Sequence, residues 1–403
     1  MPDSAGSIFD RLVNAAPPTA SRAVFDTACV LGGSVAGLLA ARVLSDFAER
    51  VVIIERDELG GPECSRPGTP YAQQLHVLLP AGARWMERWL KGFTDDVLSM
   101  GAIVGSTTAT LTVMDGQRQE LGDRDYRILC ATRSLFESCA RTSVLGLPNV
   151  SLLSARATGL QYREGAVCAV EYSDDRVAGK LETDFVVDAM GRSSRLSDWL
   201  NRGGFEQPRL ERLAMPLNYA TARFERRTAA ADLEVVGSLA TYSPGHAVDE
   251  VSIAAASVIE NDQWIVALIG YEPDRPGRTI DQFRAASAKL PALFGEAVSG
   301  KPTRDVVTYH QAESRRRHFT NLHRFPARLV CVGDAVASFN PIYGQGMSSA
   351  ALHASCLSSY LTNGADNDAA ATDFFQLQEM VVDAAWTVSA GGDAARLDAR
   401  DGK

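Results

Sequence analysis

The sequence predicts an α/β fold in which a parallel-sheet domain is interleaved with a second domain of mixed and antiparallel strands. Three observations support this prediction. A strand–turn–helix–strand unit with a glycine-rich turn occupies residues 28–57, near the start of the chain. A buried strand followed by a carboxylate and a glycine-rich loop occupies residues 329–350. Between them, residues 102–130 and 213–272 alternate apolar and polar side chains, as strands with one buried face do.

The first unit is typical of a dinucleotide-binding βαβ segment. ACVL is an apolar strand, Gly32 to Gly37 form a tight turn, LLAARVLSDF is an amphipathic helix, and VVIIERD is a second strand. Gly32 permits the turn, Gly37 permits close packing of helix on strand, and the helix N-terminus can hold a pyrophosphate. The middle glycine of the usual pattern is Ser34, whose hydroxyl can also bond phosphate.

Glu55 ends the second strand of this unit, 23 residues after Gly32. An acid at this place accepts hydrogen bonds from ribose hydroxyls and disfavours a 2′-phosphate. FAD or NAD therefore fits the unit better than NADP.

The second ligand-binding signal is CVGDAVASFNPIYGQGMSSA at residues 331–350. Its apolar strand leads into Gly333 and Asp334, then into a Pro- and Gly-containing loop, and a helix is predicted from about Gly346. Asp334 can accept hydrogen bonds from sugar or ribityl hydroxyls. The amides of residues 344–347, with the positive end of the helix dipole, can face a negative charge.

The other elements are predicted from periodicity. Helices are expected near 72–92, 133–146 and 279–300, and further strands over 151–187. Residues 1–25 are expected to form a flexible extension. The C-terminal residues 365–403 are expected to form a helix with a polar, Ala/Asp/Gly-rich tail that frays. A chain of 403 residues is long enough for two closely joined domains.

Composition excludes several functional classes. A net charge of −9 argues against a nucleic-acid binder or a basic membrane-surface protein. No segment has the roughly 18 consecutive apolar residues of a membrane span, and residues 1–25 lack the apolar core of a signal peptide. The seven cysteines (residues 29, 64, 130, 139, 168, 331 and 356) show no CxxC or metal-ligand spacing. They predict reduced core thiols in a cytoplasmic protein.

Three motifs together resemble the FAD-dependent monooxygenases of the para-hydroxybenzoate hydroxylase fold, called group A flavoprotein monooxygenases. They are GGSVAGLLAARVL with VVIIERD, DFVVDAMGRSSRL, and VCVGDAVASFNPIYGQGMSSAALHA, and the likeness extends over about residues 26–390. RPGTPYAQQLHVLLPAGA and the GDA-x-x-x-FNP-x-YGQGM run are most similar to polyketide-tailoring members, including polyether-antibiotic epoxidases.

The resemblance implies a Rossmann-type FAD-binding domain in three parts, interleaved with a mixed or antiparallel substrate-binding sheet domain in two. The FAD-binding parts are residues 26–100, 131–212 and 311–364. The substrate domain takes residues 101–130 and 213–310. The extension over 1–25 and the C-terminal helix and tail over 365–403 complete the chain.

The resemblance also places the cofactor residues. The glycine-rich turn would surround the pyrophosphate, Glu55 would hold the adenosine ribose, and Arg56 would lie beside the adenine or phosphates. Arg133 would reach the phosphate–ribityl region, and the backbone near Ala157 would contact adenine. The turn residues concerned are Gly32, Gly33, Ser34, Ala36 and Gly37.

On the flavin side, Asp334 would bind the ribityl chain or the pyrophosphate. The loop that follows would curve beneath the isoalloxazine, with the amides of Gly346 and Met347 directed at its N1–C2 edge. That edge becomes negative on reduction, so a helix N-terminus is favourable there. The loop residues concerned are Pro341, Gly344, Gln345, Gly346 and Met347.

The chemistry implied is monooxygenation of an apolar, polyketide-like small molecule. In the family, reduced FAD reacts with O₂ to give a C4a-hydroperoxide, which epoxidises or hydroxylates the substrate. Aromatic hydroxylases of the family have Asp-Gly where this chain has Met190-Gly191, with Asp188 the nearest acid, so the resemblance does not place the NAD(P)H site. No second glycine-rich βαβ unit is present. NAD(P)H would therefore dock transiently, or a separate flavin reductase would supply the electrons.

No catalytic side chain follows from the motifs, because this chemistry needs no protein nucleophile, metal or carboxylate pair. Three residues are candidates for the pocket: Tyr219 and Trp264 in the inserted sheet, and His76, which either lines the pocket or is a structural histidine. Tyr71 and Gln74 stand where relatives often have Gln and His. This difference either changes the substrate preference or has no functional meaning. Arg315 to Arg317 form either a clamp for an NADPH phosphate or a solvated basic run.

Two alternatives use the same scaffold. A halogenase would carry a Trp-x-Trp-x-Ile-Pro segment and a catalytic lysine near the front of the chain, and neither is present. An FAD-bound cyclase that closes rings in a polyene without redox chemistry would have nearly the same sequence. Oxygen incorporation into the product separates the monooxygenase from the cyclase, and a colourless purified chain would indicate a binding protein without flavin.

Overall fold

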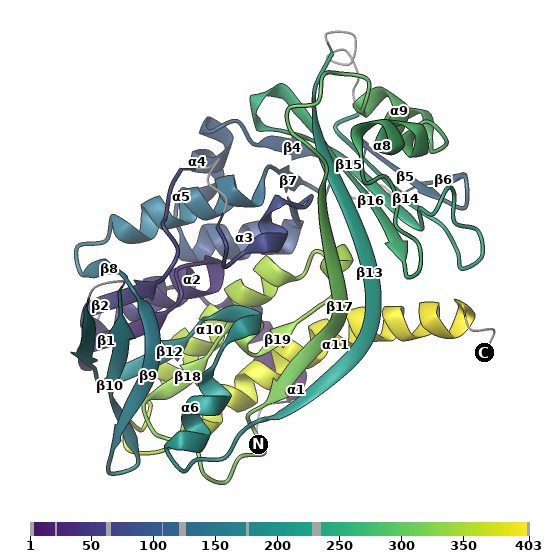
Figure 1. Ribbon diagram of the computed structural model, residues 1–403. Helices are drawn as coiled ribbons and strands as arrows, with labels where there is room; N and C mark the ends of the chain where they lie inside the picture. Colours follow the sequence, from purple (N-terminus) through teal and green to yellow (C-terminus); the bar gives the residue numbers. More distant parts are fainter. Residues whose placement is uncertain are drawn as a thin grey trace.

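The computed structural model shows two sheet-based domains linked by two long strands, as in Figure 1. It describes residues 4–20, 22–61, 66–106, 108–120, 126–174, 177–227 and 235–400. The fold class predicted from the sequence, a parallel-sheet domain interleaved with a mixed-sheet domain, is confirmed.

The first domain is built on a five-stranded parallel sheet. The glycine-rich turn leads from β1 into helix α2 (Val35–Leu44) and on to β2, so the turn lies at the carboxyl end of the central strand. The strand of the late motif, β18, pairs with β12 on the other side of β1. The strand order is β18 (Leu329–Cys331), β12 (Phe185–Asp188), β1 (Phe25–Leu31), β2 (Ala48–Glu55), β8 (Val150–Ser154).

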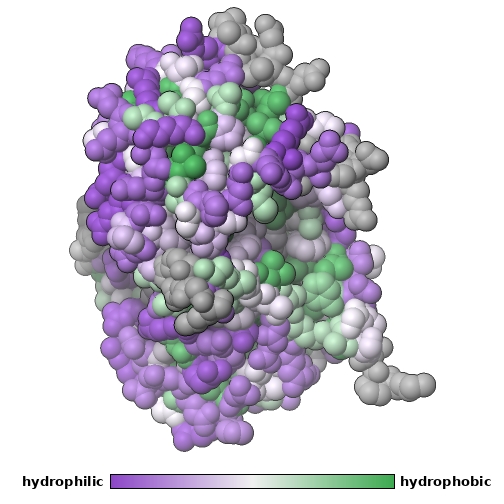
Figure 2. Space-filling model, turned by 90° about the vertical axis from the view of Figure 1, so that its right-hand side faces the viewer, coloured by the Kyte–Doolittle hydropathy of each residue, from purple (hydrophilic) through white to green (hydrophobic). Residues whose placement is uncertain are grey.

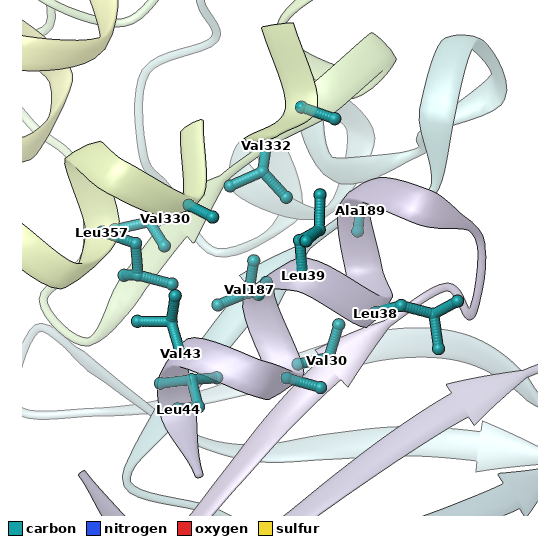
Figure 3. Close-up of a cluster of buried hydrophobic side chains, with 14 of the residues drawn as sticks. Val30, Leu38, Leu39, Val43, Leu44, Val187, Ala189, Val330, Val332 and Leu357 are labelled. Carbon is teal, nitrogen blue, oxygen red and sulfur yellow. The ribbon is translucent and has the colours of Figure 1, made fainter. Parts of the chain in front are cut away.

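Helices α2 and α10 (Gly346–Thr362) cover one face of this sheet. An antiparallel sheet of β9 (Arg156–Arg163), β10 (Ala166–Ser173) and β11 (Ala178–Glu182) lies on the other. The near-continuous apolar runs of the parallel strands follow from burial on both faces. Figure 3 shows side chains of α2, α10 and the parallel strands converging in this core, including Val30, Leu39, Val43, Val187, Val330 and Leu357.

The remaining helices of this domain surround the sheet and its connections. They are α3 (Pro80–Trp89), α4 (Phe93–Ser99), α5 (Arg133–Leu145) and α6 (Leu196–Arg202). A small sheet joins β3 (Val77–Leu78), β7 (Ile128–Cys130) and β4 (Ile103–Gly105) in that order. The helix expected near 72–92 begins only at Pro80, because a proline is favourable in the first helical turn and unfavourable inside a helix.

The second domain is an eight-stranded sheet whose longest strand has 17 residues and runs from one domain into the other (Figure 1). Helices α8 (Ile280–Ser287) and α9 (Ala292–Ala297) cover one of its faces. The strand order is β19 (Ala337–Ser338), β17 (Val307–His318), β13 (Arg209–Glu225), β16 (Gln263–Tyr271), β15 (Ile253–Ile259), β14 (Gly237–Thr241), β5 (Thr110–Met114), β6 (Gln117–Gln119).

The flexible extension expected at the N-terminus is wrong within the described residues. The helix expected near the C-terminus is present, but it continues through the segment that was expected to fray. Residues 5–14 form helix α1 (Ala5–Asn14), which Ser4 caps and which buries Leu12. At the other end, α11 (Thr372–Arg400) is one continuous helix. Its buried positions recur at helical spacing through the Ala- and Gly-rich part, and small side chains there allow close packing. They are Phe375, Gln378, Val382, Trp386, Ser389 and Asp393.

Six cysteines lie in the described ranges and all are free thiols, whereas Cys64 lies outside those ranges. Within the same ranges, no helix has both the length and the apolar character needed to cross a membrane. No group of three or more His, Cys, Asp or Glu side chains among the described residues is placed to hold a metal ion.

Candidate cofactor and substrate site

Two cavities meet at the carboxyl ends of the parallel strands. The larger, of about 510 Å³, runs past Gly32, Glu55 and Ala157. The smaller, of about 210 Å³, lies between the loop after β18 and the eight-stranded sheet. Ser34 and Asp334 line both, so the two form one elongated space. This is the place where open α/β sheets bind ligands.

The glycine-rich turn is closely packed. A Cβ atom on Gly37 would lie only 1.8 Å from the carbonyl oxygen of Gly32, and Gly32 itself has a φ of +107°. Glycine is therefore required at both positions for α2 to start directly against β1. Gly33 does not line either cavity; its N–H donates to Glu55 at 2.7 Å.

Ser34 lies at the junction of the two cavities and is held by two charged side chains. Its hydroxyl donates to Oε2 of Glu137 at 2.7 Å and accepts from Nη2 of Arg133 at 2.9 Å. Glu137 also pairs with Arg66, and all three charged side chains are buried. Burial alone would raise the pKa of the Glu137 carboxyl, but Arg133 and Arg66 outweigh it and hold that pKa below its usual range.

Glu55 ends β2 at the wall of the larger cavity. Its carboxylate accepts from the N–H of Gly33 and from Arg66, both at 2.7 Å, and from the N–H of Asp57 at 2.8 Å. A carboxylate has about four lone-pair sites, so one remains for a ribose hydroxyl. Arg56 lines the same cavity with a side chain 40% exposed.

Asp334 follows β18 and lies beside Gly191 of the middle motif. Burial raises the pKa of its carboxyl, and the cations of Arg133 and Arg192 offset part of that rise. The turn before it is fixed from α10, because the N–H of Gly333 donates to Nδ1 of the buried His353 at 2.8 Å. This histidine was not predicted as a site residue.

In the middle motif, the acid Asp188 does not line either cavity. Asp188 is buried, and its carboxylate accepts from the N–H of Met190 at 2.9 Å and from the hydroxyl of Ser194. It therefore shapes the turn, whereas Gly191 and Arg192 line both cavities. Arg192 donates to Ser338 at 2.7 Å.

The loop after Asp334 forms the floor of the smaller cavity. Pro341, Gly344, Gly346 and Met347 line it, and a Cβ on Gly346 would meet open space within 4 Å. Gln345 does not line the cavity; its carbonyl accepts from Ser349 in the first turn of α10.

Asn340 anchors this loop. It is fully buried, and its Oδ1 accepts from the N–H of Ile342 at 3.1 Å and from the hydroxyl of Tyr219 at 3.3 Å. Its Nδ2 donates to Asp393 of α11 at 2.8 Å, and the hydroxyl of Tyr343 donates to the same carboxylate oxygen at 3.2 Å. The C-terminal helix therefore holds the loop in place.

The eight-stranded sheet forms the roof of the smaller cavity, and strand parity decides which side chains face it. Ala267 and Ile269 of β16 line the cavity, as does Tyr219 of β13. Trp264 stands on the opposite face of β16, packed in the cluster under α8 and α9, and is 1% exposed. The expectation that Trp264 lines the pocket is therefore wrong, since an even-numbered residue of β16 points away from it.

Comparison with known proteins places the chain in a family. No protein-family model matches the sequence. The protein Rv3254 of Mycobacterium tuberculosis is 31% identical over 345 residues, which is 82% of this chain and 71% of that protein. The chain belongs to the Rv3254 family. FixC of Escherichia coli K12 is 27% identical over 182 residues, 45% of this chain and 40% of FixC.

Solved structures show that the chain has the fold seen in flavin-dependent monooxygenases. PqsL of P. aeruginosa, solved with 2-aminobenzoylacetate, superposes with a TM-score of 0.70 and 20% identity over 93% of this chain and 96% of PqsL. The p-nitrophenol 4-monooxygenase PnpA of Pseudomonas putida superposes with a TM-score of 0.66 and 18% identity over 93% of this chain and 89% of PnpA. The flavin-dependent brominase Bmp2 superposes with a TM-score of 0.64 and 16% identity over 88% of this chain and 83% of Bmp2.

The arginine run of this family member is engaged within the protein. Arg315 donates to the carbonyl of Arg192, and Arg317 donates to the carbonyl of Ala335 at 2.7 Å. Arg316 pairs with Glu211 at 2.9 Å and lies 4.9 Å from the centre of the Trp386 ring. These contacts make the run structural and leave the proposed NADPH clamp without support.

Sequence reasoning missed Arg66, Glu137, His353 and Asp393. Glu137 carried one signal, because it lies four positions after Arg133 on a predicted helix and faces the same side. The other three act on partners far away in the chain, which no local pattern reveals. Arg66 and Glu137, for example, are 71 positions apart.

Proposed function

We propose that the protein is an FAD-dependent monooxygenase that inserts one oxygen atom from O₂ into an apolar, polyketide-like small molecule. The observation that carries the proposal is the pair of joined cavities, with Ser34, Arg133 and Asp334 at their junction. An elongated dinucleotide needs a long cavity with anion-binding groups at its middle. An apolar substrate needs the second, sheet-lined chamber next to it.

The residues present fit FAD. Ser34, the N-terminus of α2 and Arg133 suit a pyrophosphate at the junction. The remaining lone pair of Glu55 suits a ribose hydroxyl, with Ala157 and Arg56 along the adenine end. Asp334 suits the ribityl chain, and the open side of Gly346 leaves room for a flat ring against the first turn of α10.

When bound, FAD would supply the redox chemistry that divides O₂ between substrate and water, with NAD(P)H as the proposed electron donor. The chain's own contributions are to position and to shield. The first turn of α10 offers amides and a positive helix end to a ring that becomes negative on reduction. The loop from Pro341 to Met347 separates the ring from the core, and the sheet shields the roof of the inner part of the chamber from water.

Epoxidation and hydroxylation are both compatible with this arrangement. The purified protein should be yellow, should bleach when NAD(P)H is added without oxygen, alone or together with a flavin reductase, and should transfer ¹⁸O from ¹⁸O₂ to its product. A product formed without oxygen and without a change in mass would instead support a non-redox cyclase.

The cofactor site is tested by Asp334→Ala. Loss of charge-assisted hydrogen bonds worth about 1.5–3 kcal/mol should weaken FAD binding by roughly ten- to a hundredfold. Flavin occupancy after purification and the dissociation constant from fluorescence titration measure this. Asp10→Ala, on the exposed side of α1, is the control and should keep full occupancy. Full occupancy in Asp334→Ala would contradict the assignment.

A further inference from the structure

The smaller cavity has two chemically different ends. Its outer end is aliphatic, formed by side chains of three neighbouring strands, β14 to β16. Leu239 is 39% exposed while lining this end, so the cavity opens to solvent there. Figure 2, viewed from the side of the eight-stranded sheet, shows a hollow with hydrophobic side chains at its rim. The aliphatic residues are Leu239, Ile253, Ala255, Ala267 and Ile269.

The inner end is aromatic and polar. The ring of Tyr71 lies 6.2 Å from that of His76 and 6.4 Å from that of Tyr309, and Tyr309 lies 6.1 Å from Tyr219. Gln311 lies among them and accepts from the Tyr309 hydroxyl at 3.1 Å. These four rings and one amide form a surface on which a planar ring can pack.

His76 presents a hydrogen-bond acceptor to this end. Its Nδ1 lies 3.0 Å from the carbonyl oxygen of Gln74, and a carbonyl can only accept, so Nδ1 carries the hydrogen. In a neutral imidazole, Nε2 is then an acceptor. The described residues give Nε2 no hydrogen-bond partner, and His76 lines the cavity. Burial and the nearby Arg133 lower the pKa of His76 to about 4, so the ring is neutral at physiological pH.

Formal charges in the described lining are confined to the junction. Arg192 and Asp334 line both cavities, and Arg133 is bonded to Ser34 at the same place. Beyond these residues, the described lining is aliphatic, aromatic or neutral polar. The Arg133 guanidinium lies 5.8 Å from the Tyr71 ring centre, and it is already paired with Glu137. An anion at the inner end would therefore lose its hydration and compete with Glu137 for Arg133.

We propose that this chamber binds a neutral amphiphile with a hydroxylated ring at the inner end, whose hydroxyl donates to Nε2 of His76, and an apolar chain along β14 to β16. The proposal deepens the proposed function, on which it rests for taking the chamber as the substrate site. His76 is thereby a specificity-determining residue. It selects a hydroxyl donor over an ether or an anion of the same size.

The test uses three probes of one size: 4-butylphenol, 4-butylanisole and 4-butylbenzoate. Binding to the FAD-loaded, oxidised protein is measured by titration calorimetry at pH 7, with no reductant present. The phenol should bind about tenfold more tightly than the anisole, because one hydrogen bond is added in a desolvated site. The benzoate should bind most weakly. Equal binding of phenol and anisole, or tightest binding of the benzoate, would overturn the proposal.

His76→Phe keeps a ring and removes the acceptor. It should reduce the phenol-to-anisole ratio to about one by weakening phenol binding, with anisole binding changed less than twofold. His246→Phe, at an exposed position outside the cavity lining, should keep the tenfold ratio. A ratio retained in His76→Phe would refute the role of this residue. If that variant does not fold, the three-probe comparison on the unaltered protein still decides.

Failure of the proposed function gives a different result. A protein that binds 4-butylphenol selectively but holds no flavin, or transfers no ¹⁸O to any product, would refute the monooxygenase and leave the binding proposal standing. A yellow protein that transfers ¹⁸O but does not distinguish the probes would support the monooxygenase and refute the binding proposal.

Discussion

His353 shows how one buried side chain sets the turn that carries Asp334, the residue proposed to bind the cofactor. It is completely buried in α10, and its Nδ1 accepts from the N–H of Gly333, immediately before Asp334. Burial lowers the pKa of this imidazole to about 3. Only the neutral ring can accept this hydrogen bond, so protonation would remove the support of the turn that carries Asp334.

We therefore expect the His353 imidazole to make the protein less stable in acid, in addition to the effect of His76, whose pKa is also lowered. The folded-state pKa of about 3 lies below the unfolded value of about 6.5. Below pH 6.5 only the unfolded chain takes up this proton, so the stabilisation is complete above that pH and is lost as the pH falls toward 3. The contribution to the free energy of unfolding is about 1.4 kcal/mol per pH unit in this window.

His353→Gln keeps an acceptor for Gly333 but cannot titrate. Urea unfolding between pH 4.5 and 6 measures how the free energy of unfolding changes with pH. In His353→Gln this slope should correspond to about one proton fewer taken up on unfolding than in the unaltered protein. An identical slope in both would show that the imidazole is not kept neutral by the fold.

At the scale of secondary-structure elements, the sequence predicts what depends on neighbours in the chain. The turn Gly32 to Gly37, the two strands around it and α10 follow from periodicity and glycine spacing, and the structure has each of them. Helix α1 carried the same kind of signal, with Ser4 as cap and a helical stripe ending in Leu12, although it was expected to be flexible.

The remaining errors concern contacts between elements. Alternation shows that Trp264 and Ile269 lie on opposite faces of β16, but not which face opens on a cavity. That depends on α8 and α9 covering the Trp264 side. The network of Ser34 with Glu137 joins positions 103 apart, so only the folded chain reveals it.

The α2–β1 junction gives a test at this scale. Gly37→Ala would put a methyl group 1.8 Å from the Gly32 carbonyl oxygen, which forces α2 away from β1. We expect a loss of roughly 1–3 kcal/mol in the free energy of unfolding, together with loss of bound flavin. Denaturant unfolding and flavin content measure the two effects.

Gly391→Ala is the matched control, because it adds the same methyl group where no atom lies within 4 Å, on the exposed side of α11. Helix propensity should make it more stable by roughly 0.5–1 kcal/mol, with flavin retained. Equal effects of the two substitutions would show that the close approach at Gly37 does not determine the fold of the turn.

In the whole molecule, α11 connects the parts that form the site. It packs beside α10 and α1 in the first domain, and its last turns reach the second, where Arg396 donates to the carbonyl of Tyr242 and stacks 4.9 Å from the Tyr271 ring centre. Between these contacts, Asp393 holds Asn340 and Tyr343 of the loop below the smaller cavity. The helix therefore ties the position of the loop to the packing of both domains.

Asp393→Ala should loosen that loop without touching either cavity, since Asp393 lines neither. Asn340 Nδ2 and the Tyr343 hydroxyl would lose a buried acceptor, at a cost of about 1–3 kcal/mol. Amide hydrogen exchange over residues 340–347 should accelerate in the flavin-free protein, and the dissociation constant for FAD should rise about tenfold. Asp398→Ala, exposed on the same helix, should change neither. If exchange over 340–347 stays slow in Asp393→Ala, α11 packs against both domains but does not position the loop.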